Sequence, residues 1–156
     1  MLTLFALLLS LSAEQASVPA VHISKEEHEK VLKESIANKV VDQPIKATEV
    51  PGGKASVAML HRVKPEVSSL IHDRVTETYY ILSGSGTIVT GGRLGDAKPT
   101  DLTRVNAGMS QTGTRIGGDS RKVKPGDIVI VPAGTPHGFS DLDGPISYLV
   151  YRFEPK

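Results

Sequence analysis

From Gln43 onward, the chain is divided into short apolar runs by frequent glycine and proline residues. These runs are rich in Val, Ile, Thr and Tyr, residue types that favour β-strands. They read ASVAMLHRV, TYYILS, GTIVT, DIVIV and ISYLVYRF. Many short strands separated by turn residues, with no second helix among them, are typical of sandwiches and barrels. The sequence therefore predicts an all-β sandwich or barrel for this part of the chain.

One segment before this region has a helical pattern, from Ser24 to Asn38. Ser24 with Glu27 forms a capping box, which satisfies free N–H groups of a first helical turn. The expected packing face consists of His28, Val31, Leu32, Ser35 and Ile36, which recur at helical spacing. We predict a helix over residues 24–38 and interpret His28 as a packing residue, not a metal ligand.

The first residues contain an apolar run from Leu2 to Leu11. It is too short to span a bilayer, which takes about 20 residues, and it has the length of the apolar part of a secretory signal peptide. No Lys or Arg precedes the run, so a second interpretation stays open, an apolar arm that packs on the barrel or on another subunit. We expect residues 1–16 to be a signal peptide and the protein to be exported, to the periplasm or out of the cell. Under the second interpretation it is cytoplasmic.

The composition excludes several kinds of site. The chain has no cysteine, so disulfides, thiolate zinc sites, iron–sulfur clusters and a thiol nucleophile are excluded. The net charge is +1 and the 18 Lys and Arg residues are scattered, which argues against nucleic acid and membrane surfaces as partners. With no tryptophan there is also little basis for a stacking platform. We expect a small-molecule partner, no nucleic acid, and no membrane after processing.

Two stretches carry side chains suited to metal binding. In IHDRVTETYYILSGSG, His72 is followed by Glu77 and then by Gly84. Residues 73–76 suit a hairpin loop, which would place His72 and Glu77 opposite each other on adjacent strands, with Cβ atoms about 5 Å apart. In GDIVIVPAGTPHGFSD, an apolar strand ends in a turn that leads directly to His137. His137 is therefore the candidate for a third ligand.

Taken together, these stretches resemble the two sequence motifs of the cupin superfamily. The matching residues are His72, Glu77 and Gly84 in the first motif and Gly126, Pro132, Gly134 and His137 in the second, where Asp141 replaces an asparagine. The resemblance covers roughly residues 55–153, with one copy of each motif. It implies a single cupin barrel, a double-stranded β-helix or jelly roll, over residues 44–156. It also implies a divalent metal ion held by His72, Glu77 and His137, and this donor set suits Fe, Mn, Ni or Zn.

One position departs from the family's pattern, because Leu70 stands where the first motif histidine would be. Leu70 should face the same interior as His72, so an apolar wall replaces one ligand. His61 is the nearest substitute, although a half-exposed strand histidine is the better interpretation of it. Three protein ligands still suffice for a catalytic metal site, which commonly leaves a position open. The alternative is a barrel without metal, in which His72, Glu77 and His137 form a hydrogen-bonded cluster.

Other residues are weaker candidates for roles around this site. Asp141 can orient His137 through a hydrogen bond, and a Ser140–His137–Asp141 triad is discounted because no strained nucleophile turn surrounds Ser140. Possible substrate contacts are Tyr79, Tyr151 and Arg74.

The stretch from 91 to 119 has seven glycines and little periodicity, which predicts a long loop or lid. An outward pair, Tyr80 and Leu82, suits a contact in a homodimer.

The sequence thus favours a small metal-dependent cupin enzyme that acts on a small oxygen-rich organic substrate. Dioxygenase, isomerase, lyase and decarboxylase chemistries all occur among proteins with this resemblance, and the sequence does not choose among them. The second hypothesis is a non-catalytic barrel without metal that binds a small molecule or serves as an assembly unit.

Overall fold

The computed structural model describes residues 17–156, so the expectations for residues 1–16 lie outside the described part of the chain. Residues 17–156 form one α-helix, one short 3-10 helix and eleven β-strands. In chain order these are α1 (Lys25–Asn38), β1 (Asp42–Val50), β2 (Gly53–Arg62), β3 (Ser69–His72), β4 (Thr76–Ser83), β5 (Gly86–Thr90), β6 (Arg93–Asp101), η1 (Thr103–Val105), β7 (Met109–Ile116), β8 (Asp119–Val123), β9 (Ile128–Val131), β10 (His137–Leu142) and β11 (Ile146–Pro155). Within residues 17–156, no helix has both the length and the apolar character needed to cross a membrane.

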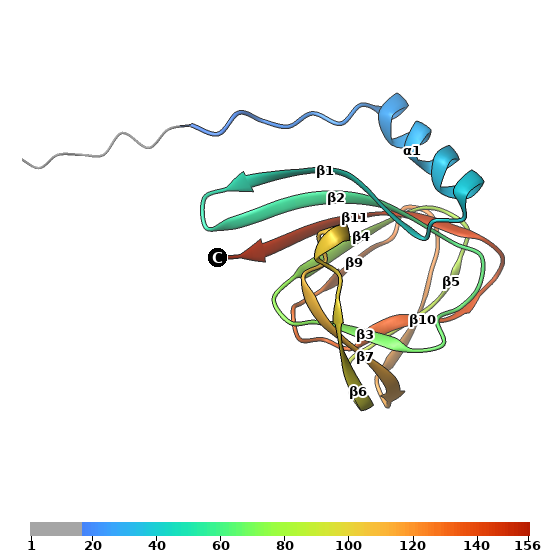
Figure 1. Ribbon diagram of the computed structural model, residues 1–156. Helices are drawn as coiled ribbons and strands as arrows, with labels where there is room; N and C mark the ends of the chain where they lie inside the picture. Colours follow the sequence, from blue (N-terminus) through green and yellow to red (C-terminus); the bar gives the residue numbers. More distant parts are fainter. Residues whose placement is uncertain (1–16) are drawn as a thin grey trace, which may run out of the picture.

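The strands form two antiparallel sheets that face each other around a common interior (Figure 1). Sheet A has the strand order β1-β2-β11-β4-β9, and sheet B has the order β6-β7-β3-β10-β5-β8. Some neighbours are consecutive in the chain, as β1 with β2 and β6 with β7, and others are far apart in it, as β2 with β11 and β3 with β10. The prediction of an all-β barrel with one N-terminal helix is confirmed.

The interior of the barrel follows from the alternation of side chains along each strand. In β4, Glu77, Tyr79 and Ile81 are buried, whereas Tyr80 between them is 39% exposed. The apolar core consists of Ala58, Leu60, Tyr79, Ile81, Ile88, Val123, Phe139, Ile146, Tyr148 and Val150. Because Glu77 lies on the same face as Tyr79, the strand that builds the core also carries a charged group into the interior.

Helix α1 lies against β1 and β2 on the outer side of sheet A (Figure 1). Its N-cap is Ser24, whose side chain accepts a hydrogen bond from the Glu27 backbone N–H at 3.1 Å. The Glu27 side chain pairs with Lys46 of β1 at 3.1 Å and thereby ties the helix to the sheet. Of the expected packing face, Ser35 is buried and His28, Val31 and Leu32 are half-buried, whereas Ile36 is 50% exposed.

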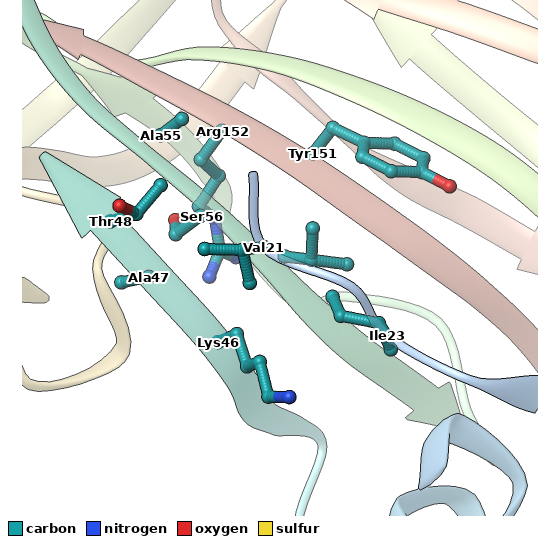
Figure 2. Close-up of a pocket in the computed structure, with 10 residues that line it drawn as sticks. Val21, Ile23, Lys46, Ala47, Thr48, Ala55, Ser56, Tyr151 and Arg152 are labelled. Carbon is teal, nitrogen blue, oxygen red and sulfur yellow. The ribbon is translucent and has the colours of Figure 1, made fainter. Parts of the chain in front are cut away.

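The segment before α1 also covers part of sheet A. Val21 and Ile23 lie over β1, β2 and β11, where they line an apolar surface hollow of about 260 Å³ together with Tyr151 (Figure 2). Tyr151 is 46% exposed on this outer face. The hollow lies outside the barrel, and Tyr151 is therefore not a contact of the interior.

The prediction of a long loop over residues 91–119 is wrong. This stretch forms β6 and β7, which pair with each other and are joined through η1. Apolar periodicity is weak because β6 is an edge strand of sheet B and is exposed along most of its length, so it needs no continuous apolar face. Several of the glycines serve the turns that end these strands, as at Gly92 and Gly117, which have positive φ angles of 74° and 75°.

Candidate metal centre

The three predicted ligands come from both sheets of the barrel. His72 ends β3 and His137 begins β10, and these two strands are neighbours in sheet B. Glu77 lies in β4, which belongs to sheet A and pairs with β11 and β9. The prediction that His72 and Glu77 face each other within one hairpin is therefore wrong. Residues 73–75 instead lead the chain from one sheet to the other, and the two side chains meet across the interior.

The structure nevertheless brings the three side chains together. Nε2 of His72 lies 3.4 Å from Oε1 of Glu77, and Nε2 of His137 lies 3.4 Å from Oε2 of the same carboxylate. One ligand atom from each residue lies within 4.8 Å of the other two. All three residues are buried, with at most 3% of their surface exposed. This buried His-Glu-His group can hold a metal ion.

The second ring nitrogen of each histidine is already occupied. Nδ1 of His72 lies 2.8 Å from Oγ of Ser110, and this hydroxyl donates in turn to the Ala107 carbonyl. Nδ1 of His137 lies 2.9 Å from the Thr135 carbonyl, which can only accept. Both Nδ1 atoms are therefore engaged, and the Nε2 atom of each ring faces Glu77. Metal-binding histidines have this arrangement, since a hydrogen bond to the other ring nitrogen fixes the tautomer and the orientation of the ring.

The Glu77 carboxylate is held by two direct hydrogen bonds. Nε of Arg152 donates to Oε1 and the Tyr79 hydroxyl donates to Oε2, each over 2.7 Å. Arg152 also pairs with Asp42 at 2.6 Å and donates to the Val105 carbonyl at 2.6 Å. The carboxylate is therefore fixed in position by residues of β4 and β11, and through Arg152 by β1 and η1.

Sequence reasoning missed Arg152, although the sequence contained a signal for it. Arg152 follows Tyr148 and Val150 at alternate positions of ISYLVYRF, and all three are buried in the structure. A charged residue at an inward position of an apolar strand requires a buried partner. The same alternation could have identified Arg152 as a neighbour of the buried carboxylate.

The environment sets the charge of these groups. Burial by itself raises the pKa of Glu77, but hydrogen bonds from His137 and His72 and the charge of Arg152 hold that pKa well below its usual range. Burial and the charge of Glu77 raise the pKa of Tyr79 well above its usual value, so its hydroxyl remains a donor. Burial lowers the pKa of His137, but the hydrogen bond with Glu77, the charge of Glu77 and the Thr135 carbonyl together raise that pKa above its usual value. Glu77 is thus an anion that attracts a positive charge.

Part of that positive charge is supplied by the protein. A buried carboxylate needs a compensating charge or partner, and Arg152 forms an ion pair with Glu77. The metal interpretation therefore depends on the two Nε2 atoms that face Glu77 and not on an uncompensated carboxylate. Two imidazole nitrogens and one carboxylate oxygen suit a divalent ion such as Fe, Mn, Ni or Zn.

The predicted wall at Leu70 is present. Leu70 of β3 is paired with His137 of β10 and lines the internal cavity beside the three candidate ligands. This cavity has a volume of about 30 Å³, which is enough to hold a water molecule. Its lining is completed by Asp42, Leu60, Arg62, Glu66, His72, Glu77, Tyr79, Leu102, Ala107, His137 and Arg152.

Most of the weaker candidates lie away from this cluster. His61 bonds through Nδ1 to the Ser147 hydroxyl at 2.9 Å and does not line the cavity. Arg74 is exposed and donates to the Pro155 carbonyl. Asp141 is exposed, so it does not orient His137, a role that the Thr135 carbonyl fills.

Two of the remaining candidates have clear structural roles. Ser140 donates from its hydroxyl to the Thr87 carbonyl at 3.3 Å on the exposed side of β10 and forms no triad with His137. Tyr79 reaches the site, where its hydroxyl is satisfied by Glu77.

No protein-family model and no curated protein matches this sequence. Among solved structures, a protein from Bacillus halodurans matches with a TM-score of 0.53 and 14% identity, over 88% of this chain and 84% of its own. The DMSP lyase DddQ from Ruegeria pomeroyi has a TM-score of 0.43 and 19% identity, over 67% of this chain and 40% of its own. A cupin protein from Bacteroides fragilis has a TM-score of 0.38 and 18% identity, over 65% of this chain and 66% of its own. At such identities these comparisons concern the fold alone.

The architecture and the site together define the class of this protein. Two facing antiparallel sheets form a barrel, and the histidines and the glutamate of the two cupin-like motifs lie on its inner wall. The chain has the cupin fold, as a single barrel preceded by one helix.

Proposed function

We propose that this protein binds a divalent metal ion through His72, Glu77 and His137 and is an enzyme acting on a small oxygen-rich organic substrate. The observation that carries this proposal is the engagement of both Nδ1 atoms by Ser110 and Thr135, which leaves both Nε2 atoms directed at the buried carboxylate. Such an ion, when bound, acts as a Lewis acid or, if it is iron, as a redox centre.

The residues around the cluster would support this chemistry. Ser110 and the Thr135 carbonyl hold the two imidazole rings, and Arg152 and Tyr79 hold the carboxylate. Leu70 supplies no fourth ligand and so leaves a position for water or substrate. Because the internal cavity is small, the reacting part of the substrate has to be small as well. Dioxygenase, isomerase, lyase and decarboxylase reactions all remain compatible with this set of residues.

The test is the metal content of the purified protein, measured by plasma mass spectrometry for the parent and for His72→Ala and His137→Ala. We expect nearly one divalent ion per chain in the parent and a loss of most of it in both variants. His61→Ala is the matched control, because His61 lies outside the cluster and should leave the metal content unchanged. A parent that takes up none of Fe, Mn, Ni or Zn on reconstitution would contradict the proposal.

A second candidate function is a metal-free barrel that binds a small molecule or serves as an assembly unit. The ion pair between Arg152 and Glu77 favours it, because the buried carboxylate is compensated by the protein itself. The two candidates differ in their response to metal, since a ligand that binds only the folded state stabilises it. A melting temperature that is the same in EDTA and in each divalent metal would support the metal-free barrel.

We further propose that two copies of the chain pair through the outer face of sheet A. Exposed apolar side chains gather there, with Ile128 65%, Ile130 66%, Tyr80 39%, Tyr151 46% and Phe153 42% exposed. Ile128 lies beside Tyr80 in the register of β9 and β4, so the apolar surface is continuous across the two strands. β9 is one of the two edge strands of sheet A and carries no charged side chain. An apolar, uncharged face is complementary to a second copy of itself.

Export remains a proposal that rests on the apolar run from Leu2 to Leu11. Intact-mass measurement of the protein recovered outside the cytoplasm tests it. A mature chain that lacks about the first 16 residues would support export, whereas a full-length chain found only in the cytoplasm would favour the apolar arm.

A further inference from the structure

A second hollow lies on the surface directly outside the internal cavity. It has a volume of about 300 Å³ and is formed by Val41 and the connection between β2 and β3. Its lining residues are Val41, Arg62, Val63, Lys64, Pro65, Glu66, Val67, Ser68 and Leu70. Arg62, Glu66 and Leu70 also line the internal cavity. These three side chains therefore form the partition between the surface hollow and the cluster of candidate ligands.

The guanidinium of Arg62 is held in a fixed orientation at this partition. Its Nε donates to the Tyr148 hydroxyl at 2.7 Å, and its Nη2 lies 2.9 Å from Oε1 of Glu66. Glu66 is fixed in turn, since its Oε2 accepts a hydrogen bond from the Phe139 backbone N–H at 2.7 Å. Nη1 of Arg62 has no hydrogen-bond partner within residues 17–156, and the side chain is 16% exposed. The Nη1 group is thus a preoriented donor available to a ligand.

The rest of the hollow combines apolar walls with a positive charge. Val41, Val63, Pro65, Val67 and Leu70 supply the apolar surface. Of the charged lining residues, Arg62 and Lys64 are cations and Glu66 is an anion, so the lining carries one net positive charge. Arginine is the side chain best suited to bind a carboxylate through paired N–H donors, and pockets for small ligands typically pair apolar walls with a few polar groups.

We propose that this surface hollow, named here the entry hollow, binds a small monocarboxylic acid with an aliphatic body. Arg62 binds the carboxylate through Nη1, Lys64 adds a second positive charge at the rim, and the aliphatic body packs on the valines and on Leu70. Because Leu70 also lies beside His137, a ligand bound here is directly outside the candidate metal centre. The role of this acid as substrate rests on the proposed function, but its binding by Arg62 does not require a metal ion.

The test uses metal-free protein, so its result is independent of the metal measurement. Propionate is the probe, and propionamide, which has nearly the same shape without the charge, is its control. We expect propionate to shift the backbone amide NMR signals of residues 63, 64, 66–68 and 70 in a saturable way, and propionamide to shift them much less. Arg62→Gln should weaken propionate binding at least about tenfold, or about 1.4 kcal/mol. Arg121→Gln, which changes an exposed arginine of β8, should leave binding unchanged.

A further variant keeps the test decisive if Arg62→Gln does not fold. Glu66→Gln removes the competing negative charge but retains an oxygen that can accept the hydrogen bond from Phe139, and it should strengthen propionate binding. Equal shifts with propionate and propionamide, or unchanged propionate affinity in a folded Arg62→Gln protein, would overturn the proposal. Weaker propionate binding in Glu66→Gln would also overturn it. Propionate binding in a protein that takes up no metal would support the proposed binding site in the entry hollow and contradict the proposed metal-dependent enzyme.

Discussion

Arg152 donates a hydrogen bond from Nε to Oε1 of Glu77 over 2.7 Å, and the two residues are directly paired on β11 and β4. The same guanidinium pairs with Asp42 and donates to the Val105 carbonyl. A candidate metal ligand is therefore compensated in charge and fixed in place by a residue 75 positions away in the chain.

Replacing this arginine should destabilise the metal-free protein. Arg152→Met leaves the buried Glu77 carboxylate without its cation, and we expect a loss of about 3–5 kcal/mol in the free energy of unfolding. Arg152→Lys retains the charge but not the forked geometry, so its loss should be smaller. Urea unfolding in EDTA measures both variants. A loss below about 1 kcal/mol for Arg152→Met, the size of an exposed pair, would show that the ion pair contributes little.

Leu70→His should add a ligand to the candidate metal centre. Position 70 is paired with His137 across β3 and β10 and precedes His72 by two residues on the same face. An imidazole there can reach the same ion, and we expect metal affinity to rise at least about tenfold, or about 1.4 kcal/mol. Competition with a chelator measures this change. Ile71→His is the control, because it places a histidine on the opposite face of the same strand and should have no effect.

Ser110→Ala should weaken metal binding although Ser110 is not a proposed ligand. Its hydroxyl lies 2.8 Å from Nδ1 of His72 and so fixes the orientation of the ring. Loss of such a partner typically lowers metal affinity about 10- to 100-fold. Isothermal titration of the metal-free protein measures the affinity, with Ser140→Ala on the exposed side of β10 as the control. Equal affinities for the parent and Ser110→Ala would indicate that the ring is positioned by packing alone.

Alkaline pH should destabilise the barrel through its buried tyrosines. Burial raises the pKa of Tyr148 well above the usual value of 10, and burial with the charge of Glu77 raises that of Tyr79. The unfolded chain loses these protons near pH 10 whereas the folded chain keeps them, so stability is complete below pH 10 and falls as the pH rises further. Each tyrosine contributes a slope of about 1.4 kcal/mol per pH unit. Urea unfolding at several pH values should show a shallower fall for Tyr148→Phe than for the parent.

Charged substitutions on the outer face of sheet A should abolish the proposed dimer. Ile128→Lys and Ile130→Lys place charges on β9, where both side chains are mostly exposed. We expect a dimeric parent and monomeric variants by light scattering coupled to size exclusion. Ile116→Lys, on β7 of sheet B, is the control and should remain dimeric. A parent that is monomeric at about 100 μM, a concentration at which even a micromolar dimer forms, would contradict the pairing.

Local patterns in the sequence were sufficient for the class of fold and for the three candidate ligands. Short runs of β-forming residues separated by Gly and Pro predicted the barrel, because strand formation and turn conformation depend on near neighbours. Period-two alternation placed Glu77 on the same face as Tyr79, and the turn at residues 132–136 led directly to His137. Each of these inferences spans only a few residues.

Only the tertiary structure decided how the strands are paired and which side chains meet. The short link at residues 73–75 suits a hairpin as well as a crossing between sheets, and only the packing of both sheets around one core selects the crossing that separates β3 from β4. The hydrogen-bond partners of the site residues were likewise not predictable from near neighbours. Ser110 is 38 residues from His72, and Asp42 is 110 residues from Arg152. Register between distant strands is set by burial of the whole core, and no local sequence pattern contains that information.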